Sequence, residues 1–276
     1  MPSSPCEKEE WGAKAWDFLC NLRSGSPLIQ CITNFVSMDL MANTLLAAGA
    51  SPAMIHALEE IPDFTPHVHG LCINIGTLTP QWLPSMKAAA IEASRSAKPW
   101  VLDPVAVSAS PFRLQACNEL VDLKPTVIRG NASEILALSN GFSGPNKGVD
   151  SNHSSMDAVE AAKSLAQTKG TIVAVSGAID IITNGTQVVG VHNGVPMMQR
   201  ITATGCAVTA LISAFIASNV EHPFEATASA LAVFGVAGEL GMSKANGPSS
   251  LRNHLIDSLH VLDRSTFLSH VRISDL

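Results

Sequence analysis

The sequence predicts an α/β fold in which a mostly parallel central sheet is covered by helices on both faces. Short apolar runs alternate with longer helical stretches, and this alternation is typical of parallel sheets. The last part of the chain is helical only, and neither an internal repeat nor a linker divides the 276 residues. We therefore expect a single domain over residues 1–276, with residues 1–10 as a flexible N-terminal segment.

The expected elements follow one another as strand, helix, strand. The run PLIQCI at 27–32 predicts the first strand, and a helix at 38–48 follows it. Further strands are expected in short apolar runs at 71–75, 100–102, 126–128 and 171–175. Further helices are expected between them, at 80–96, 113–123, 132–138 and 156–168.

Other segments depart from this alternation. Residues 139–155 are rich in Gly, Ser and Asn, which predicts a surface loop. In 180–194, the pair Asn184-Gly185 stands between two apolar runs and predicts a hairpin with a tight turn. Beyond Thr204 only helices are expected, at about 205–218, 224–240 and 249–262.

The composition excludes several classes of protein. Charged residues make up 14% of the chain, against about 25% in an average protein. Hydrophobic residues make up 46% and the net charge is −6, so the chain is not disordered. No cluster of Lys and Arg is present, which argues against binding to nucleic acid. The low charge also predicts that part of the surface is covered by further copies of the chain.

The six cysteines form no CxxC pair, which argues against a zinc site or a thioredoxin-type motif. The N-terminal sequence MPSSPCEKEEWG lacks the apolar core of a signal peptide. A cytoplasmic location with free thiols is therefore expected. Residues 201–220 carry no charge and are long enough to cross a bilayer. Their Thr, Ser and Asn residues and the lack of flanking anchors favour a buried helix instead, so no membrane partner is expected.

Ligands of parallel sheets bind beyond the carboxyl ends of the strands. In this sequence small, polar groups that suit a phosphate recur at nearly every such end. They are Thr33-Asn34, Asn74, Gly76-Thr77, Asp103-Pro104, Arg129-Gly130-Asn131, Ser176-Gly177 and Thr204-Gly205-Cys206. This recurrence predicts that the ligand site lies at this edge of the sheet.

The segment ITATGCAVTALISAF is the strongest single motif. A Thr-x-Thr-Gly turn leads directly into a long apolar helix, whose first N–H groups and dipole suit a phosphate or a transferring phosphoryl group. The alternative interpretation is that Thr204 is only an N-cap and Cys206 a small buried side chain.

Two acidic positions are candidate metal ligands. Asn131 and Glu134 stand one turn apart at a helix start, where an amide and a carboxylate can both reach Mg²⁺ or its waters. Asp103 ends a strand in the sequence LDPV. An ordinary helix cap and a turn Asp before proline remain the alternatives.

Other candidates are weaker. The spacing of His56, His67 and His69 matches no zinc pattern, so loop or core histidines are favoured. Met54 follows a short apolar run and either lines a ligand pocket or belongs to the core. The sequence contains no GxxxxGK[ST], GxGxxG or GxSxG motif, which argues against P-loop kinases, Rossmann dehydrogenases and α/β-hydrolases.

Six segments in order carry a family resemblance. They are CITNFVSMDLMANTLLAAGASPAM, INIGTLTP, VLDPVAVSAS, VIRGNASEI, VAVSGAIDII and TATGCAVTALISAF. Together they resemble the hydroxyethylthiazole kinase family, the thiamine-salvage branch of the ribokinase-like superfamily. The resemblance implies a ribokinase-like fold, a homotrimer with sites between subunits, and Mg²⁺-dependent transfer of phosphate from ATP to the alcohol of 4-methyl-5-(2-hydroxyethyl)thiazole.

The resemblance also implies roles for individual residues. Met54 and Ala203 would contact the thiazole, with Asn34 close by. Arg129, Ser176 and Thr204 would bind ATP. Asp103 and Glu134 would hold Mg²⁺, supported by Asn131. Gly205 and Cys206 would form the catalytic start of the helix.

Two positions depart from related patterns. Cys206 stands where most ribokinase-like enzymes have an Asp general base, and we expect the helix N-terminus to lower the pKa of its thiol. Ala203 stands where the family usually has Gly. Two other functions stay open: a kinase for another small heteroaromatic alcohol such as hydroxymethylpyrimidine, and a nucleotide-binding regulatory protein without catalysis.

Overall fold

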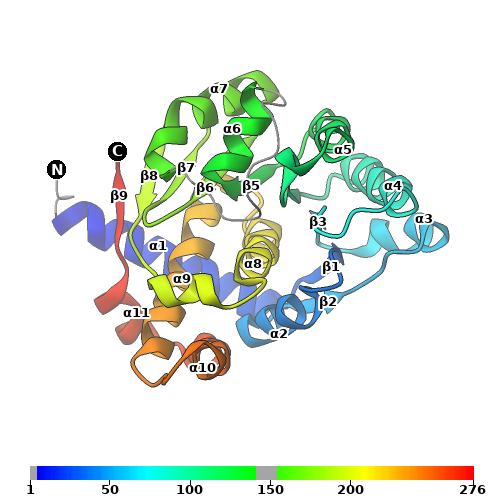
Figure 1. Cartoon of the computed structure of the whole chain (residues 1–276). Helices are drawn as coiled ribbons and strands as arrows, with labels where there is room; N and C mark the ends of the chain where they lie inside the picture. The colour runs from blue at the N-terminus through cyan, green and yellow to red at the C-terminus, as the bar shows by residue number, and fades with distance from the viewer. Residues whose placement is uncertain (1–4, 141–153) are drawn as a thin grey trace.

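The computed structural model describes residues 5–140 and 154–276, and within them one nine-stranded sheet forms the centre of the molecule (Figure 1). The order of the strands across the sheet is β2-β1-β3-β4-β5-β6-β7-β8-β9. Their bounds are β1 Leu28–Ile32, β2 Ser51–Ala53, β3 Gly70–Asn74, β4 Trp100–Asp103, β5 Val127–Asn131, β6 Ile172–Ser176, β7 Asp180–Thr183, β8 Val188–Val191 and β9 Ile273–Asp275.

The strands from β2 to β6 run parallel, and β7, β8 and β9 continue the sheet in antiparallel pairs. The strands β3 and β4 are buried along their whole length, as expected for strands with helices on both faces. Parallel pairing also brings their last residues level: Asn74 lies opposite Asp103. The mostly parallel sheet expected from the sequence is therefore confirmed.

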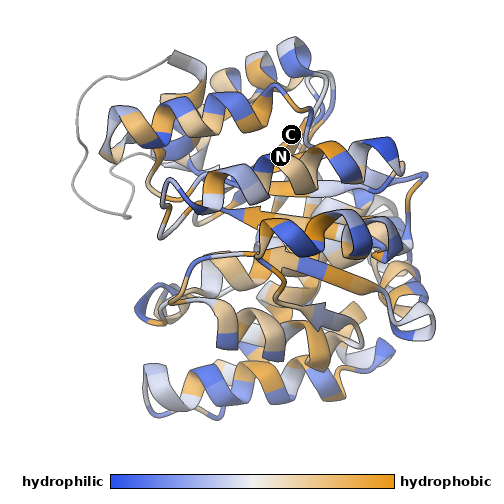
Figure 2. Ribbon diagram, turned by 90° about the vertical axis from the view of Figure 1, so that its right-hand side faces the viewer, coloured by the Kyte–Doolittle hydropathy of each residue, from blue (hydrophilic) through white to orange (hydrophobic). Residues whose placement is uncertain are grey.

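Helices form a layer on each face of this sheet (Figure 1). One layer contains α1 Pro5–Gly25, α2 Met38–Ala48, α8 Thr204–Ser218, α9 Pro223–Met242, α10 Pro248–Val261 and α11 Arg264–His270. The other contains α4 Trp82–Arg95, α5 Pro111–Val121, α6 Ala132–Asn140 and α7 Val159–Lys169. A short helix, α3 Ile61–Phe64, precedes β3. Figure 2 shows that many of the helices are polar on one side and apolar on the other.

The alternation of side chains along each strand separates two apolar cores. Cys72 and Val101 point into the core shared with α8 and α9, whereas Leu71, Ile73 and Leu102 point into the core shared with α4 and α5. Both cores contact the same strands from opposite sides. The sheet is therefore held rigidly, and the loops at its carboxyl end start from fixed positions.

The structure corrects several expectations. The chain beyond Thr204 is not helical only, because β9 pairs with β8 at the antiparallel edge and lies beside α1. The helices α1 and α11 and the short strand β2 were also not expected from the sequence. Their signals are weak, since polar and apolar residues are mixed along the sequence of α1 and β2 has only three residues. Of the loop expected at 139–155, residues 141–153 lie outside the described part of the chain.

The expected hairpin is present between β7 and β8, and Thr183 pairs with Val188 at its end. Its connection has the four residues 184–187, and the side-chain Oδ1 of Asn184 accepts hydrogen bonds from the N–H groups of Thr186 and Gln187. Gly185 has φ +95°, the left-handed conformation that glycine adopts without strain.

The uncharged segment 201–220 contains α8, a buried helix of 15 residues. Among the described residues, none of the helices has both the length and the apolar character needed to cross a membrane.

Candidate active site at the carboxyl end of the sheet

The loops after the parallel strands meet the first turn of α8 around a cavity of about 330 Å³. Parallel pairing brings the ends of β4 and β5 to the same edge, and α8 starts opposite them. The cavity is lined by Asp103, Val105, Arg129, Asn131, Glu134, Gln199, Ile201, Thr202, Ala203, Thr204, Gly205 and Cys206. Six of the strand-end candidates thus share one cavity with Glu134 and Ala203: Asp103, Arg129, Asn131, Thr204, Gly205 and Cys206.

Asp103 is fully buried at the end of β4. Its Oδ2 accepts hydrogen bonds from Nδ2 of Asn74 at 2.7 Å and from the hydroxyl of Thr209 at 2.9 Å. Its Oδ1 is buried and has no hydrogen-bond partner among the described residues. Burial raises the pKa of Asp103, and the nearby guanidinium of Arg129 opposes this rise. One carboxylate oxygen is therefore held in place while the other is left for a ligand.

Glu134 lies in the first turn of α6 and forms a reciprocal cap with Asn131. Its Oε2 accepts a hydrogen bond from the N–H of Asn131 at 2.8 Å, and Oδ1 of Asn131 accepts one from the N–H of Glu134 at 2.9 Å. Its Oε1 accepts a further bond from the N–H of Ala106. Burial and the charge of Asp103 raise the pKa of Glu134 to about 7. The capping interpretation is therefore correct, and it fixes the carboxylate in the wall of the cavity.

Arg129 is the cation between these acidic groups. Its Nη2 donates a hydrogen bond to the hydroxyl of Ser176 on the neighbouring strand β6. Its Nε is buried and has no hydrogen-bond partner among the described residues. A Cβ at Gly205 would lie 2.7 Å from Nη1 of Arg129, so the glycine lets the start of α8 approach the guanidinium closely.

The first turn of α8 differs from the expected cap. The hydroxyl of Thr204 donates to the carbonyls of Met198 and Ile201, and the N-cap residue is Ala203, which cannot cap with its side chain. The interpretation of Thr204 as a simple N-cap is therefore wrong. Ala203 has φ +70°, a conformation that costs an L-residue roughly 1–2 kcal/mol.

The expectation of a low thiol pKa at Cys206 is also wrong. Burial, and to a smaller extent the charge of Asp103, raise its pKa to about 11, and the hydrogen bond from Asn34 offsets only part of this rise. Desolvation and a neighbouring carboxylate therefore outweigh the helix dipole. The side chain is a protonated thiol at neutral pH.

Asn34 links the end of β1 to this centre. Its Nδ2 donates to Oδ1 of Asn74 at 2.8 Å and lies 3.5 Å from Sγ of Cys206. A Cβ at Gly76 would lie 2.6 Å from that Nδ2, so only glycine leaves room for Asn34. Asn34, Asn74 and Asp103 thus form one hydrogen-bonded chain from β1 to β4.

Met54 is not brought into the cavity with the other candidates. It follows β2, packs against the core and lines neither of the cavities at this edge. Its carbonyl, however, lies 3.1 Å from Nδ1 of His56, and Nε2 of the same ring accepts a hydrogen bond from the N–H of Thr33. Met54 is therefore connected to the start of the Asn34 loop by a single side chain.

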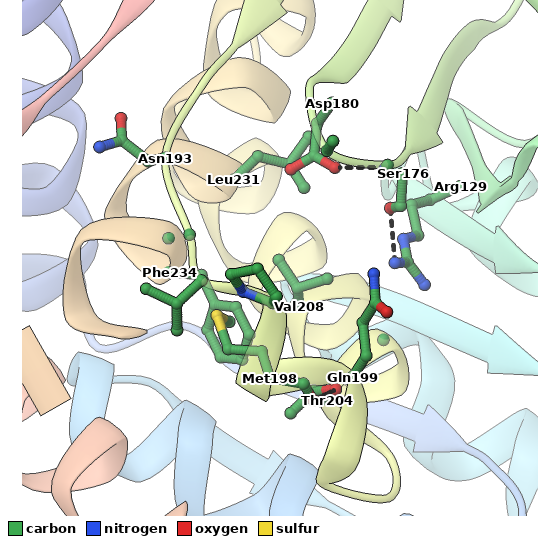
Figure 3. A pocket seen from close by; sticks show the side chains of 17 residues that line it. Arg129, Ser176, Asp180, Asn193, Met198, Gln199, Thr204, Val208, Leu231 and Phe234 are labelled. Atoms are coloured by element: carbon green, nitrogen blue, oxygen red, sulfur yellow. Dashed lines mark hydrogen bonds between the residues drawn. The ribbon is translucent and has the colours of Figure 1, made fainter. Parts of the chain in front are cut away.

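A second cavity of about 250 Å³ adjoins the first and shares Arg129, Gln199, Thr204 and Gly205 with it. Figure 3 shows Arg129 and Ser176 on one side and the apolar side chains of Met198 and Phe234 on the other. The apolar part of its lining comprises Val195, Pro196, Met198, Val208, Leu231 and Phe234.

Sequence reasoning missed several groups at these cavities. Asp180 lines the second cavity, where its Oδ1 accepts a hydrogen bond from the N–H of Gly177 (Figure 3). Burial raises its pKa to about 6. Arg113 of α5 donates to the carbonyls of Ile75, Gly76 and Val105 and so joins the loops after β3 and β4. Asp180 is the first residue of β7 and Arg113 lies within α5, so neither belongs to the residues that follow a parallel strand, which were the candidates from the sequence.

The donor set fits a magnesium ion but not a metal held by protein alone. Among the described residues, no group of three His, Cys, Asp or Glu side chains is placed to hold a metal. Mg²⁺ is commonly bound by one or two carboxylates together with substrate phosphates and waters. The unpartnered Oδ1 of Asp103 and the carboxylate of Glu134 in the same cavity match that requirement.

Comparison with known proteins identifies the family. A model of the hydroxyethylthiazole kinase family matches residues 19–265. The hydroxyethylthiazole kinase of Arabidopsis thaliana is 64% identical to the chain over 99% of both sequences. This chain belongs to the hydroxyethylthiazole kinase family.

The fold agrees with a solved structure of the family. The hydroxyethylthiazole kinase of Pyrococcus horikoshii superposes with a TM-score of 0.88 and 36% identity, over 96% of this chain and 99% of that chain. A ribokinase-like superfamily protein of Enterococcus faecalis, 13% identical over 87% of this chain and 88% of that chain, superposes with a TM-score of 0.57 and shows the fold alone. The ribokinase-like fold expected for a hydroxyethylthiazole kinase is confirmed.

Proposed function

We propose that this member of the hydroxyethylthiazole kinase family transfers the γ-phosphoryl group of ATP to the primary alcohol of 4-methyl-5-(2-hydroxyethyl)thiazole, as part of thiamine salvage. The alcohol oxygen forms a bond to phosphorus, the bond to the β-phosphate breaks, and the alcohol proton is released. The observation that carries the proposal is the shared cavity, in which the start of α8 faces Asp103 and Glu134. Such transfers depend mainly on positioning and charge stabilisation, which this cavity supplies.

ATP is placed across both cavities. Arg129 and Ser176 bind its phosphates, because a guanidinium and a hydroxyl are suitable phosphate donors. Thr204 lines both cavities and binds the phosphates with them once its hydroxyl turns away from the carbonyls of Met198 and Ile201. The nucleoside occupies the second cavity, whose apolar wall with Phe234 suits a flat base. The γ-phosphate then reaches the first turn of α8, where backbone N–H groups stabilise its charge.

Mg²⁺ is the proposed metal, held by Asp103 and Glu134 directly or through water, with Asn131 in support. When bound it neutralises charge on the β- and γ-phosphates. The chain's own contribution is to keep both carboxylates fixed: Asn74 and Thr209 hold Asp103, and the cap with Asn131 holds Glu134.

The thiazole alcohol is placed beside Asn34 and Ala203, with Met54 at the outer side. Cys206 lies between Asn34 and the helix start, where its thiol orients the hydroxyl, and Gly205 lets the helix start approach Arg129. With its pKa raised to about 11, the thiol stays protonated at neutral pH and does not take up the alcohol proton. Its role is mainly positioning.

A homotrimer completes the alcohol site in this proposal. Phe35 and Val36 directly follow Asn34 and are 64% and 62% exposed, which is unusual for large apolar side chains next to a binding site. A neighbouring copy that covers them would also close the open side near Met54. Cys20, Cys31, Cys72, Cys117 and Cys206 are free thiols, which supports a reducing compartment such as the cytoplasm.

The decisive experiment incubates the purified protein with MgATP and the thiazole alcohol and looks for the phosphate ester by mass spectrometry. Hydroxymethylpyrimidine in a parallel ADP-release assay tests the alternative substrate. Nucleotide binding without a phosphorylated product from either alcohol would instead support the regulatory alternative. Sedimentation at several protein concentrations tests the trimer.

A further inference from the structure

His56 lies at the carboxyl end of the sheet, yet the proposed reaction assigns it no role. It follows β2 at the same end as Met54 and is half-buried. Both of its ring nitrogens are within hydrogen-bond distance of backbone atoms on two different segments. A histidine that joins two loops in this way constrains how they sit relative to each other.

The hydrogen-bond partners assign the tautomer of the ring. Nε2 lies 3.1 Å from the N–H of Thr33 and 3.3 Å from the carbonyl of the same residue. We assign Nε2 as the acceptor from that N–H, because the neutral ring can then also donate from Nδ1 to the carbonyl of Met54. The proton is then on Nδ1, which donates to the carbonyl of Met54 at 3.1 Å. A neutral imidazole therefore satisfies one donor and one acceptor on separate segments of backbone.

Aromatic contacts hold the same ring from the side. The centroid of His56 lies 4.6 Å from that of Trp82, at the start of α4. Trp82 in turn lies 4.7 Å from Phe35, the residue after Asn34. A closed set of contacts thus runs from His56 through Trp82 to Phe35 and returns along the backbone through Thr33 to His56. The carbonyl of Met54 joins this set through its hydrogen bond with His56.

We infer that His56 is a positioning residue for the alcohol substrate. It sets the place of Met54 relative to Asn34, whose side chain contacts Asn74 and Cys206 in the catalytic centre. The inference rests on the proposed function, because Met54 and Asn34 are the proposed contacts of the alcohol. The nucleotide cavities do not contain His56, so its effect is confined to the alcohol.

Three substitutions separate the contacts of the ring. His56→Phe keeps a ring against Trp82 but removes both hydrogen bonds. His56→Asn places an amide donor near the position of Nδ1, and His56→Gln places an amide oxygen near the position of Nε2. The matched control is His69→Phe, because Nδ1 of His69 accepts a hydrogen bond from the N–H of Leu28 at the opposite end of β1.

The measurement is steady-state kinetics of the purified proteins with each substrate varied in turn, together with thermal unfolding. We expect His56→Phe to raise KM for the thiazole alcohol about tenfold, because loss of the two hydrogen bonds of the ring loosens Met54 relative to Asn34, with KM for ATP changed less than about twofold. His56→Asn and His56→Gln should each recover part of the loss. His69→Phe should leave both KM values unchanged even if its melting temperature falls.

Two results would overturn the inference. One is an active wild type with an unchanged KM for the alcohol in all three His56 variants. The other is equal increases of KM for the alcohol and for ATP, which indicates general loosening of the site. A wild type that neither binds nor phosphorylates the alcohol refutes the proposed function, and the inference with it. If His56→Phe does not fold, the Asn and Gln variants decide the question.

Discussion

Nδ2 of Asn74 donates a hydrogen bond of 2.7 Å to one oxygen of the Asp103 carboxylate, while the other oxygen is buried with no partner among the described residues. The two residues end neighbouring parallel strands and are paired in register. A buried carboxylate with one free oxygen is costly for folding, because an unsatisfied acceptor loses its hydration. Such a group is consistent with a site built for a ligand rather than for stability.

Asp103→Asn tests this interpretation. The amide oxygen can accept the bonds from Asn74 and Thr209, and the NH₂ group fills the position of the free oxygen without a buried charge. We expect kcat to fall by about 100-fold or more, an effect of the size seen for lost electrostatic stabilisation. The free energy of unfolding should stay the same or rise. Kinetics and urea denaturation check both, with Glu119→Gln on the surface as the control.

Glu134→Gln tests the raised pKa of Glu134. The carboxyl titrates near 7 in the folded protein and near 4.5 when unfolded, so between these values the folded state binds more protons. Its contribution to stability is therefore complete below about pH 4.5 and is lost as the pH rises towards 7. Between pH 5 and 8, we expect the free energy of unfolding of the wild type to fall by up to about 3 kcal/mol relative to that of Glu134→Gln.

The measurement is the free energy of unfolding of both proteins without nucleotide, across that range of pH. Losses that do not depend on pH, such as a weaker cap with Asn131, cancel in the comparison of slopes. Parallel slopes for the two proteins would show that Glu134 is ionised throughout and that its burial costs little.

Cys206 should act without its thiolate. Since the thiol pKa is about 11, we expect Cys206→Ala to lower kcat by about 10-fold to 100-fold, at the low end of general-base effects, and to leave the shape of the pH–rate profile between pH 6 and 9 unchanged. Cys206→Asp should keep or raise turnover, because a carboxylate is a competent base at this position. A limb of the wild-type profile that disappears in the Ala variant would contradict the positioning role.

Ala203→Gly should relieve backbone strain at the start of α8. The left-handed conformation costs alanine roughly 1–2 kcal/mol, and glycine removes this cost. Glycine also increases the conformational entropy of the unfolded chain, which offsets part of the gain in stability. We expect a net stabilisation of up to about 1 kcal/mol, measured by chemical denaturation. Ala88→Gly in the middle of α4 is the control, and its free energy of unfolding should fall by about 1 kcal/mol. A loss of stability in both variants would show that the turn is not strained.

The sequence by itself determined the fold class, the order of most elements and the edge of the sheet at which the site lies. These depend on local patterns, namely short apolar strands, helical stretches and polar residues at strand ends, and parallel pairing then brings those ends together. The six family segments determined the expected activity as well. Weak or short signals, such as those of α1, β2 and β9, could not be recognised because tertiary contacts rather than local pattern define them.

Only the tertiary structure decided the electrostatics and the contacts between distant segments. The thiol of Cys206 has a raised pKa because burial and Asp103, which is distant in sequence, outweigh the helix start to which the thiol belongs. In the same way, the free oxygen of Asp103 and the link of His56 from Met54 to Thr33 depend on which groups become neighbours after folding. Desolvation and partner geometry are properties of the packed chain, and no local pattern of residues contains them.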